Sequence, residues 1–105
     1  MNIATQKQYI PVRLSKAEID NLKASVTSVD PQASLYLFGS RTDLKKRGGD
    51  IDFLIISENI KKSDLTDIRW NFFDEFGEQR MDILTDDGSV QTPFVEMVFP
   101  KAVKI

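Results

Sequence analysis

Two aspartates in alternate positions, Asp50 and Asp52, are the residues of this chain best placed for chemistry. In a β-strand each residue rises ~3.3 Å and neighbouring side chains alternate faces, so these carboxylates share a face with their Cα atoms ~6.6 Å apart. Mg²⁺ binds oxygen ligands and usually combines one or two carboxylates with substrate phosphates and water. The spacing therefore predicts a site for a divalent cation.

The residues around this pair explain why a cation would be needed there. Ile51 and the run 53–56 are apolar and include β-branched residues, which is typical of a central strand buried on both faces. Carboxylates at the entrance of such a strand lose hydration at a cost in free energy unless a positive charge compensates them. Isolated pairs with this spacing are usually solvated acids or turn residues, so it is the strand that favours the metal interpretation.

A second apolar strand, Leu35–Phe38, ends at Gly39, where the chain can turn tightly and its amides can approach a ligand closely. Ser40 adds a hydroxyl group, and Arg41 adds a fixed cation that suits phosphate. Alone, this tripeptide is typical of an ordinary turn at the end of a strand. Because only nine residues separate Ser40 from Asp50, we interpret this tripeptide as a phosphate-binding loop beside the metal site.

The order of strand, Gly39-Ser40, nine-residue spacer and Asp-x-Asp resembles the minimal nucleotidyltransferases of the DNA polymerase β superfamily. The resemblance implies an α/β fold of the α+β type, with a small mixed β-sheet packed with about three helices, in a single domain over residues 1–105. It implies that Gly39 and Ser40 hold the nucleoside triphosphate. It also implies that Asp50 and Asp52 ligand two Mg²⁺ ions.

The same family has a third carboxylate on a later strand, and Asp82, within residues 79–84, is the best match. A neighbouring strand lies ~4.8 Å away in a sheet, so a carboxylate there can reach the same metal site. Asp86 and Asp87 are the alternatives. They follow Leu84 in a polar stretch that predicts a turn, where aspartate is favoured for local hydrogen bonds.

The spacer departs from the commoner family form, because Gly48-Gly49 precedes Asp50 where a polar residue is frequent. The metal ligands are intact, but the ordering of the basic residues Lys45, Lys46 and Arg47 is put in doubt. These three are interpreted either as a solvated loop tip or as contacts to the triphosphate or to a partner.

Two helices are expected to support these strands. The first runs from about Lys16 to Ser28, because Ser15 and Glu18 form a capping-box pattern and Asp30-Pro31 disfavours continuation. The second begins after Ser63 as N-cap and stops at Gly77. Its apolar stripe is formed by Leu65, Ile68, Phe72 and Phe76.

Two regions beyond this stripe need a separate account. Trp70 and Phe73 lie off the main stripe, so they either widen the buried arc or face a partner, and we favour core packing. The apolar segment 92–100 is bracketed by prolines and is expected to cover an open face or edge of the sheet.

Composition excludes several classes of function. The chain has no cysteine and no histidine, so disulfides, cysteine-based zinc sites and histidine catalysis are absent. A net charge of −2 and a pI near 5.1 argue against general nucleic-acid binding. No apolar run approaches the ~18 residues of a membrane span and the N-terminus has no signal-peptide pattern, so we expect a cytoplasmic protein.

The resemblance also implies a reaction. We expect Mg²⁺-dependent transfer of AMP from ATP to a hydroxyl group. Minimal nucleotidyltransferases are commonly encoded beside HEPN-domain RNase toxins, so a tyrosine of such a toxin is the expected acceptor and this chain the antitoxin. Larger relatives carry an acceptor-binding domain for which 105 residues leave no room, so the acceptor is expected to dock from outside. The alternatives are an antitoxin that works by occlusion without catalysis, and transfer to a small molecule or RNA end.

Overall fold

The computed structural model describes residues 12–42 and 49–105. Lys45, Lys46, Arg47 and Gly48 lie outside the described residues. The described elements are, in chain order, α1 (Lys16–Val29), β1 (Ser34–Phe38), the 3₁₀ helix η2 (Gly39–Thr42), β2 (Ile51–Ile56), α2 (Lys62–Phe76), β3 (Met81–Asp86), α3 (Pro93–Val98), the 3₁₀ helix η3 (Phe99–Lys101) and β4 (Val103–Lys104).

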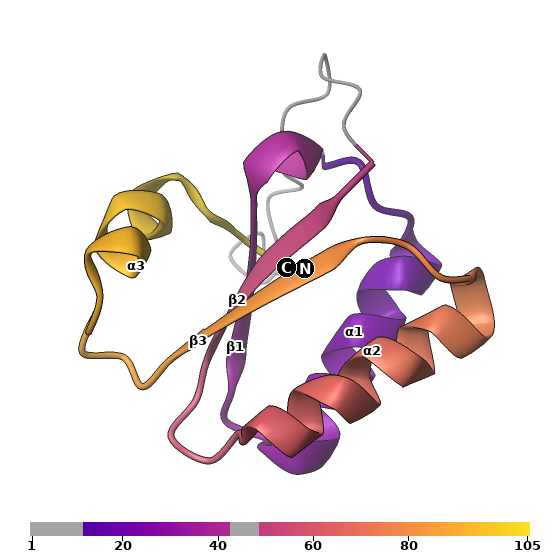
Figure 1. Ribbon diagram of the computed structural model, residues 1–105, viewed down its shortest axis with the longest axis horizontal. Helices are drawn as coiled ribbons and strands as arrows, with labels where there is room; N and C mark the ends of the chain where they lie inside the picture. The colour runs from indigo at the N-terminus through magenta and orange to yellow at the C-terminus, as the bar shows by residue number, and fades with distance from the viewer. Residues whose placement is uncertain (1–11, 43–48) are drawn as a thin grey trace, which may run out of the picture.

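The strands form one mixed sheet in the order β3-β2-β1-β4. Strand β2 runs antiparallel to β1 and parallel to β3, and β4 adds antiparallel to the outer side of β1. Helices α1 and α2 lie on one side of the strands and α3 lies on the other (Figure 1). The expected α+β fold, with a mixed sheet and three α-helices in the described residues, is confirmed. None of these helices is long and apolar enough to cross a membrane.

Helix α1 begins and ends where the sequence predicts. The Ser15 hydroxyl accepts a hydrogen bond from the Glu18 amide at 3.1 Å, and the Ser15 amide donates to the Glu18 carboxylate at 2.8 Å. Asp30 is the C-cap, in extended conformation. This confirms the capping box, which satisfies amides that the first turn of a helix cannot pair internally.

Helix α2 starts earlier than predicted, and Ser63 is not its N-cap. Lys61 takes that position, because the Asp64 carboxylate reaches back and accepts a hydrogen bond from the Lys61 amide at 2.8 Å. The carboxylate of Asp64, in the third helical position, therefore places the N-cap two residues before Ser63. The predicted stop at Gly77 is confirmed, with a positive φ of 90°.

The core lies between the sheet and the helices α1 and α2. Alternate residues of the strands point into it, as strand geometry requires. Its buried members include Leu22, Val26, Leu35, Leu37, Ile51, Phe53, Ile55, Ile68, Phe72 and Met81. Leu54 is also fully buried but belongs to the opposite face of β2. Strand β2 is thus buried on both faces, as its sequence predicts, and Asp52 shares the face of Leu54.

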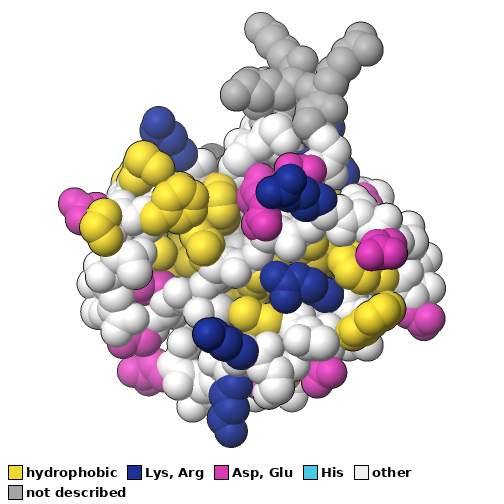
Figure 2. Space-filling view, in the orientation of Figure 1, with side chains coloured by type: hydrophobic (Ala, Val, Ile, Leu, Met, Phe, Trp, Pro, Cys, Tyr) yellow, Lys and Arg dark blue, Asp and Glu magenta, His cyan; other side chains and the backbone are white. Residues whose placement is uncertain are grey.

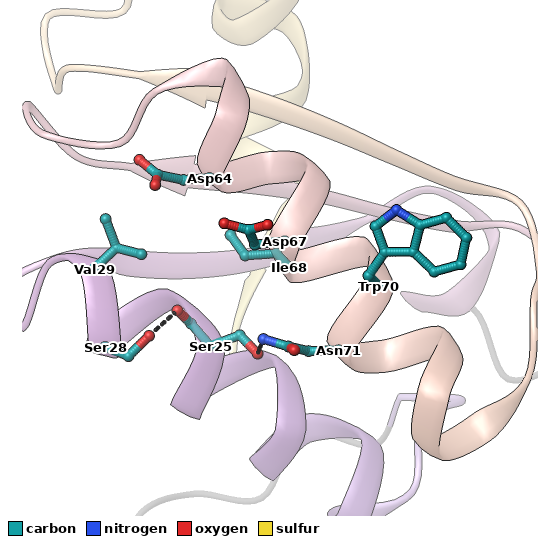
Figure 3. A pocket seen from close by; sticks show the side chains of 8 residues that line it. All are labelled: Ser25, Ser28, Val29, Asp64, Asp67, Ile68, Trp70 and Asn71. Atoms are coloured by element: carbon teal, nitrogen blue, oxygen red, sulfur yellow. Dashed lines mark hydrogen bonds between the residues drawn. The ribbon is translucent and has the colours of Figure 1, made fainter.

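The prediction of core packing is wrong for Trp70, whose side chain is 66% exposed. For Phe73 the prediction is confirmed, because this residue is partly buried and packs against the core. Trp70 is two residues from buried Ile68, a rotation of about 200° around an α-helix, so it points away from the sheet. Trp70 is among the residues that line a cavity of about 330 Å³ between α1 and α2. Figure 3 shows Asp67 and Ile68 of α2 near Ser25, Ser28 and Val29 of α1, whereas the indole ring of Trp70 points away from this group.

The apolar segment 92–100 covers an open face of the sheet, one of the two predicted roles. Phe94 on α3 makes an edge-to-face contact with Phe38 of β1, with ring centroids 6.2 Å apart. Phe99 makes a similar contact with Tyr36 at 5.1 Å. Strand β4 then pairs with β1. Unpaired strand edges favour association with other chains, and β4, which lies beyond the predicted segment, pairs with one of them.

Asp86 closes the loop after β3. Its buried carboxylate accepts hydrogen bonds from the amides of Gly88, Val90 and Gln91 at 2.8, 3.0 and 2.8 Å. The Gln91 amide is the largest of several causes that lower the pKa of this carboxyl. This is the local turn role predicted for the Asp86-Asp87 pair.

We predict that Asp86→Ala lowers the free energy of unfolding by about 2 kcal/mol or more, because three amides lose a charged acceptor. A lowered folded-state pKa adds stability that is present above pH ~4 and is lost as pH falls through the folded-state value. The difference in free energy of unfolding between Asp86→Ala and wild type should therefore become smaller in acid. Urea unfolding at pH 7 and pH 3 measures both effects. Asp87→Ala is the exposed neighbouring control, and an equal loss in that variant would contradict the assignment.

Candidate active site

The predicted carboxylates are brought together by the register of the parallel pair β2 and β3. Asp52 lies directly opposite Asp82 in this pairing, and on its other side it lies opposite Phe38 of β1. Asp50 immediately precedes β2. Helix α2 connects β2 to β3 and returns the chain so that both strands enter the sheet at the same end. The crossover therefore places Asp82 beside Asp52, while Asp86 is at the far end of β3.

Electrostatics distinguish Asp52 from its neighbours. Partial burial raises the pKa of Asp52 most, a hydrogen bond with Asp82 and the negative charges of Asp82 and Asp50 raise it further, and Arg80 lowers it slightly, for a value of about 6. A carboxyl with a raised pKa among other acids has an excess of negative charge that a cation would relieve. Such perturbed groups are common at functional sites.

Arg80 is the residue of this site that the sequence analysis missed. Its Nε lies 3.8 Å from an oxygen of Asp50 and 3.8 Å from an oxygen of Asp82. Arg80 immediately precedes β3 and is two residues before Asp82, a spacing that puts two side chains on the same face of an extended chain, and this alternation was the available signal. Figure 2 shows acidic and basic side chains grouped on this face beside the apolar side chains over α3.

Gly39 packs closely against the side chain of Asp52. Its φ is 76°, a conformation that L-residues rarely adopt, and a Cβ atom built on it would lie 2.4 Å from Oδ2 of Asp52. The glycine that the sequence analysis assigned to close approach of a phosphate thus first accommodates a carboxylate. Its role in holding the triphosphate, like that of Ser40, stays a prediction.

Arg41 ties three segments together. Its guanidinium donates hydrogen bonds to the carbonyl of Arg13, to the carbonyl of Gly49 at 3.1 Å and to the side chain of Gln79 at 3.3 Å. Arg13 in turn donates from its side chain to the carbonyl of Ser40 at 3.1 Å. Arg41 therefore fixes the loop after β1 against the residues that precede β2 and β3. Its predicted contact with phosphate stays a prediction.

A cavity of about 320 Å³ opens beside the carboxylates. Its walls are formed by polar and apolar side chains from five elements, including Phe38, Asp52, Arg69, Asp82, Leu84 and Phe94. Arg69 reaches it from α2, with Nε 3.5 Å from the carbonyl oxygen of Met81. A volume at the lower end of the range for small-molecule sites, with aromatic walls and a few charged groups, suits one nucleotide portion or an acceptor side chain.

The side chains of the site fit a magnesium ion in their chemistry. Asp50, Asp52 and Asp82 offer only carboxylate oxygens, the donors that Mg²⁺ prefers. In the described part of the chain, however, no three His, Cys, Asp or Glu side chains are already grouped as a metal cluster. Asp52 and Asp82 are in contact, whereas Asp50 and Asp82 each face Arg80. The three-carboxylate site with two Mg²⁺ ions stays a prediction.

Comparison with known proteins agrees with this fold. The sequence profile of the nucleotidyltransferase domain matches residues 19–104, which span every described strand and the predicted site. The chain therefore belongs to the nucleotidyltransferase domain family, of the polymerase β superfamily type. Domains of this family generally act on nucleoside triphosphates with divalent metals. No curated protein matches the sequence significantly.

We predict that Gly39→Ala lowers the free energy of unfolding by about 2 kcal/mol or more, because positive-φ strain of roughly 1 kcal/mol adds to a clash with Asp52. Gly77→Ala isolates the strain, since its φ is also positive but nothing lies within 4 Å. Gly49→Ala has neither problem and should be nearly neutral. A double-mutant cycle with Asp52→Ala measures the contact, and zero coupling would contradict it.

We predict that Asp52→Asn stabilises the protein above pH 6 when divalent cations are absent. A folded-state pKa of about 6 exceeds the ordinary 3.8, so the folded state binds the proton more tightly and stability falls as pH rises from 4 through about 6. Water screens this half-buried group, so we expect a gain of about 1 kcal/mol or less and a rise in Tm of a few degrees.

Thermal melts between pH 5 and pH 7.5 measure this effect. The difference between Asp52→Asn and wild type should grow across that interval. Asp67→Asn, an exposed aspartate on α2, is the control and should follow wild type. A large loss of stability in Asp52→Asn at pH 7.5 would show that Asp52 is a structural acid.

Proposed function

We propose that this protein is a Mg²⁺-dependent nucleotidyltransferase that transfers AMP from ATP to a hydroxyl group of a partner protein. The observation that carries the proposal is the Asp52–Asp82 pair, which lies in register beside the cavity of about 320 Å³ and within the nucleotidyltransferase domain. A protein that only bound a partner would have no physical need for mutually repelling carboxylates at this position.

Each residue of the site has a role in this reaction. Asp50, Asp52 and Asp82 would hold the metal. When bound, Mg²⁺ neutralises phosphate charge and activates the acceptor hydroxyl. Gly39, without a side chain, leaves room for both the Asp52 carboxylate and a phosphate at the backbone. Arg41 holds the Gly39-Ser40 loop in place through the backbone.

The transfer itself exchanges one bond to phosphorus for another. The acceptor oxygen forms a bond to the α-phosphorus, the bond from that phosphorus to the pyrophosphate oxygen breaks, and pyrophosphate leaves. The hydroxyl proton passes to a carboxylate oxygen of Asp82, whose side chain is half-exposed and borders the cavity. Because little covalent chemistry falls to the protein, positioning and charge account for most of the catalysis.

We propose further that the acceptor is a tyrosine of a HEPN-domain toxin and that the transfer makes this chain its antitoxin. This choice rests on the resemblance of the motif from Gly39 to Asp52 to minimal nucleotidyltransferases. The cavity supports it in one respect, since the aromatic walls formed by Phe38 and Phe94 suit a phenolic ring.

We predict that intact-mass analysis after incubation with ATP, Mg²⁺ and the partner shows a nucleotide adduct on the toxin. The double variant Asp50→Asn with Asp52→Asn should yield no adduct and should fail to neutralise the toxin, because the metal ligands lose their charge. The double variant Asp67→Asn with Asp74→Asn removes the same charge from the exposed surface of α2 and should behave as wild type.

Two results would overturn parts of this proposal. Full neutralisation by the Asp50→Asn, Asp52→Asn variant without nucleotide would show that the antitoxin works by occlusion. An adduct found on a small molecule or RNA end, with the toxin unmodified, would reject the protein acceptor while retaining the transferase.

A further inference from the structure

Arg80 occupies the space between the two outer carboxylates of the site. Its Nε is 3.8 Å from Asp50 and 3.8 Å from Asp82, so one guanidinium faces both acids at equal distance. The side chain is 73% exposed and both carboxylates are about half-exposed. Ion pairs between side chains that are this exposed, with their charged atoms this far apart, are weak because water and salt screen them. A divalent cation can therefore displace Arg80.

Arg80 differs in this from the other arginines of the site. The Arg41 guanidinium bonds to two backbone carbonyls and Gln79, and the Arg69 Nε faces the Met81 carbonyl. The backbone of Arg80 is anchored, since its carbonyl accepts a hydrogen bond from the Ile51 amide at 3.0 Å. The Cα atom is thus held beside the start of β2, while the long exposed side chain can change its rotamer.

We propose that Arg80 balances the charge of Asp50 and Asp82 until a divalent cation binds, and that its side chain then turns to pair with the phosphates of the nucleotide. This inference rests on the proposed transferase function. It assigns to Arg80 the phosphate contact that Arg41, committed to the backbone, is poorly placed to make. A planar guanidinium is well suited to phosphate oxygens, with which it can form two parallel hydrogen bonds.

The two halves of this role change affinity in opposite directions. Before nucleotide binds, a fixed positive charge beside the carboxylates opposes an incoming cation, so its removal should strengthen metal binding. Once the triphosphate is present, the same charge attracts it, so its removal should weaken nucleotide binding. A residue that only held the carboxylates in place would weaken metal binding when removed.

The test uses Mn²⁺ as the metal probe, with free Mn²⁺ measured by electron paramagnetic resonance in the absence of nucleotide. For Arg80→Gln we expect Mn²⁺ affinity to rise about three- to tenfold, the range that a weak exposed charge pair allows. ATP affinity in the presence of Mg²⁺, measured by calorimetry, should fall by about tenfold or more, because the charged contact with phosphate is lost. Circular dichroism checks that the exposed substitution leaves the fold intact.

Two variants make the outcome specific to charge at this position. Arg80→Lys keeps the charge and should retain Mn²⁺ affinity within about twofold of wild type, while it recovers only part of the ATP affinity because lysine cannot form the bidentate contact. Lys62→Gln removes an exposed cation at the start of α2, at the other end of the sheet from Asp50, and should change neither affinity.

The results separate this inference from the transferase proposal. Suppose that wild type binds Mn²⁺ and ATP, but that Arg80→Gln binds Mn²⁺ no more tightly than wild type does. The proposal that Arg80 balances the carboxylates until a divalent cation displaces it is then overturned, while the transferase proposal stands. If ATP affinity is unchanged in Arg80→Gln, the phosphate contact is overturned. If wild type binds neither ligand, the transferase proposal fails and this inference fails with it.

Discussion

The half-buried carboxylate of Asp52 is the group on which the rest of the site depends. Asp52 lies directly beside Asp82 on the neighbouring strand, and the negative charge of Asp50 is close by. Burial together with these two neighbours raises the pKa of Asp52 to about 6. The fold tolerates this arrangement because the other face of β2 is filled by Phe53 and Ile55, which are fully buried against α1 and α2. The free energy gained by hydrophobic burial on one face of β2 offsets the repulsion among the carboxylates on the other face.

The topology of the sheet places these carboxylates next to one another. Strand β2 and strand β3 are parallel, so the same end of each strand lies at the same edge of the sheet, and α2 spans the distance between them. On the far side of β2, the antiparallel strand β1 ends where β2 begins and delivers Gly39 against Asp52. Acids at the start of β2 and β3 thus lie beside the backbone at the end of β1, in a region where a cation would relieve an excess of negative charge.

Among the described residues, three of the arginines near the carboxylates and the cavity differ in their anchoring. Arg41 is bound to backbone carbonyls and stabilises the loop after β1. Arg69 borders the cavity from α2. Arg80 pairs loosely with two acids. Arginine remains charged in all of these settings, so what differs is the freedom of the guanidinium to meet an anionic ligand.

The sequence alone determined the local elements and the chemical character of the site. The capping box at Ser15, the stop at Gly77 and the apolar run after Asp52 each depend on neighbours within a few residues, and each is confirmed. The start of α2 was misplaced because a carboxylate at Asp64 competed with the serine at position 63, a choice between two local hydrogen bonds that the pattern does not rank.

Only the tertiary structure decided which distant residues meet. The register of β2 with β3 put Asp82 opposite Asp52 and left Asp86 to cap a loop, the crossover turned Trp70 to solvent, and packing placed Gly39 against a carboxylate. Arg41 was directed to carbonyls and Arg80 to acids for the same reason. Charge and hydrogen-bonding capacity are properties of a residue type, whereas partners are set by strand register and helix crossover, which depend on the packing of the whole core.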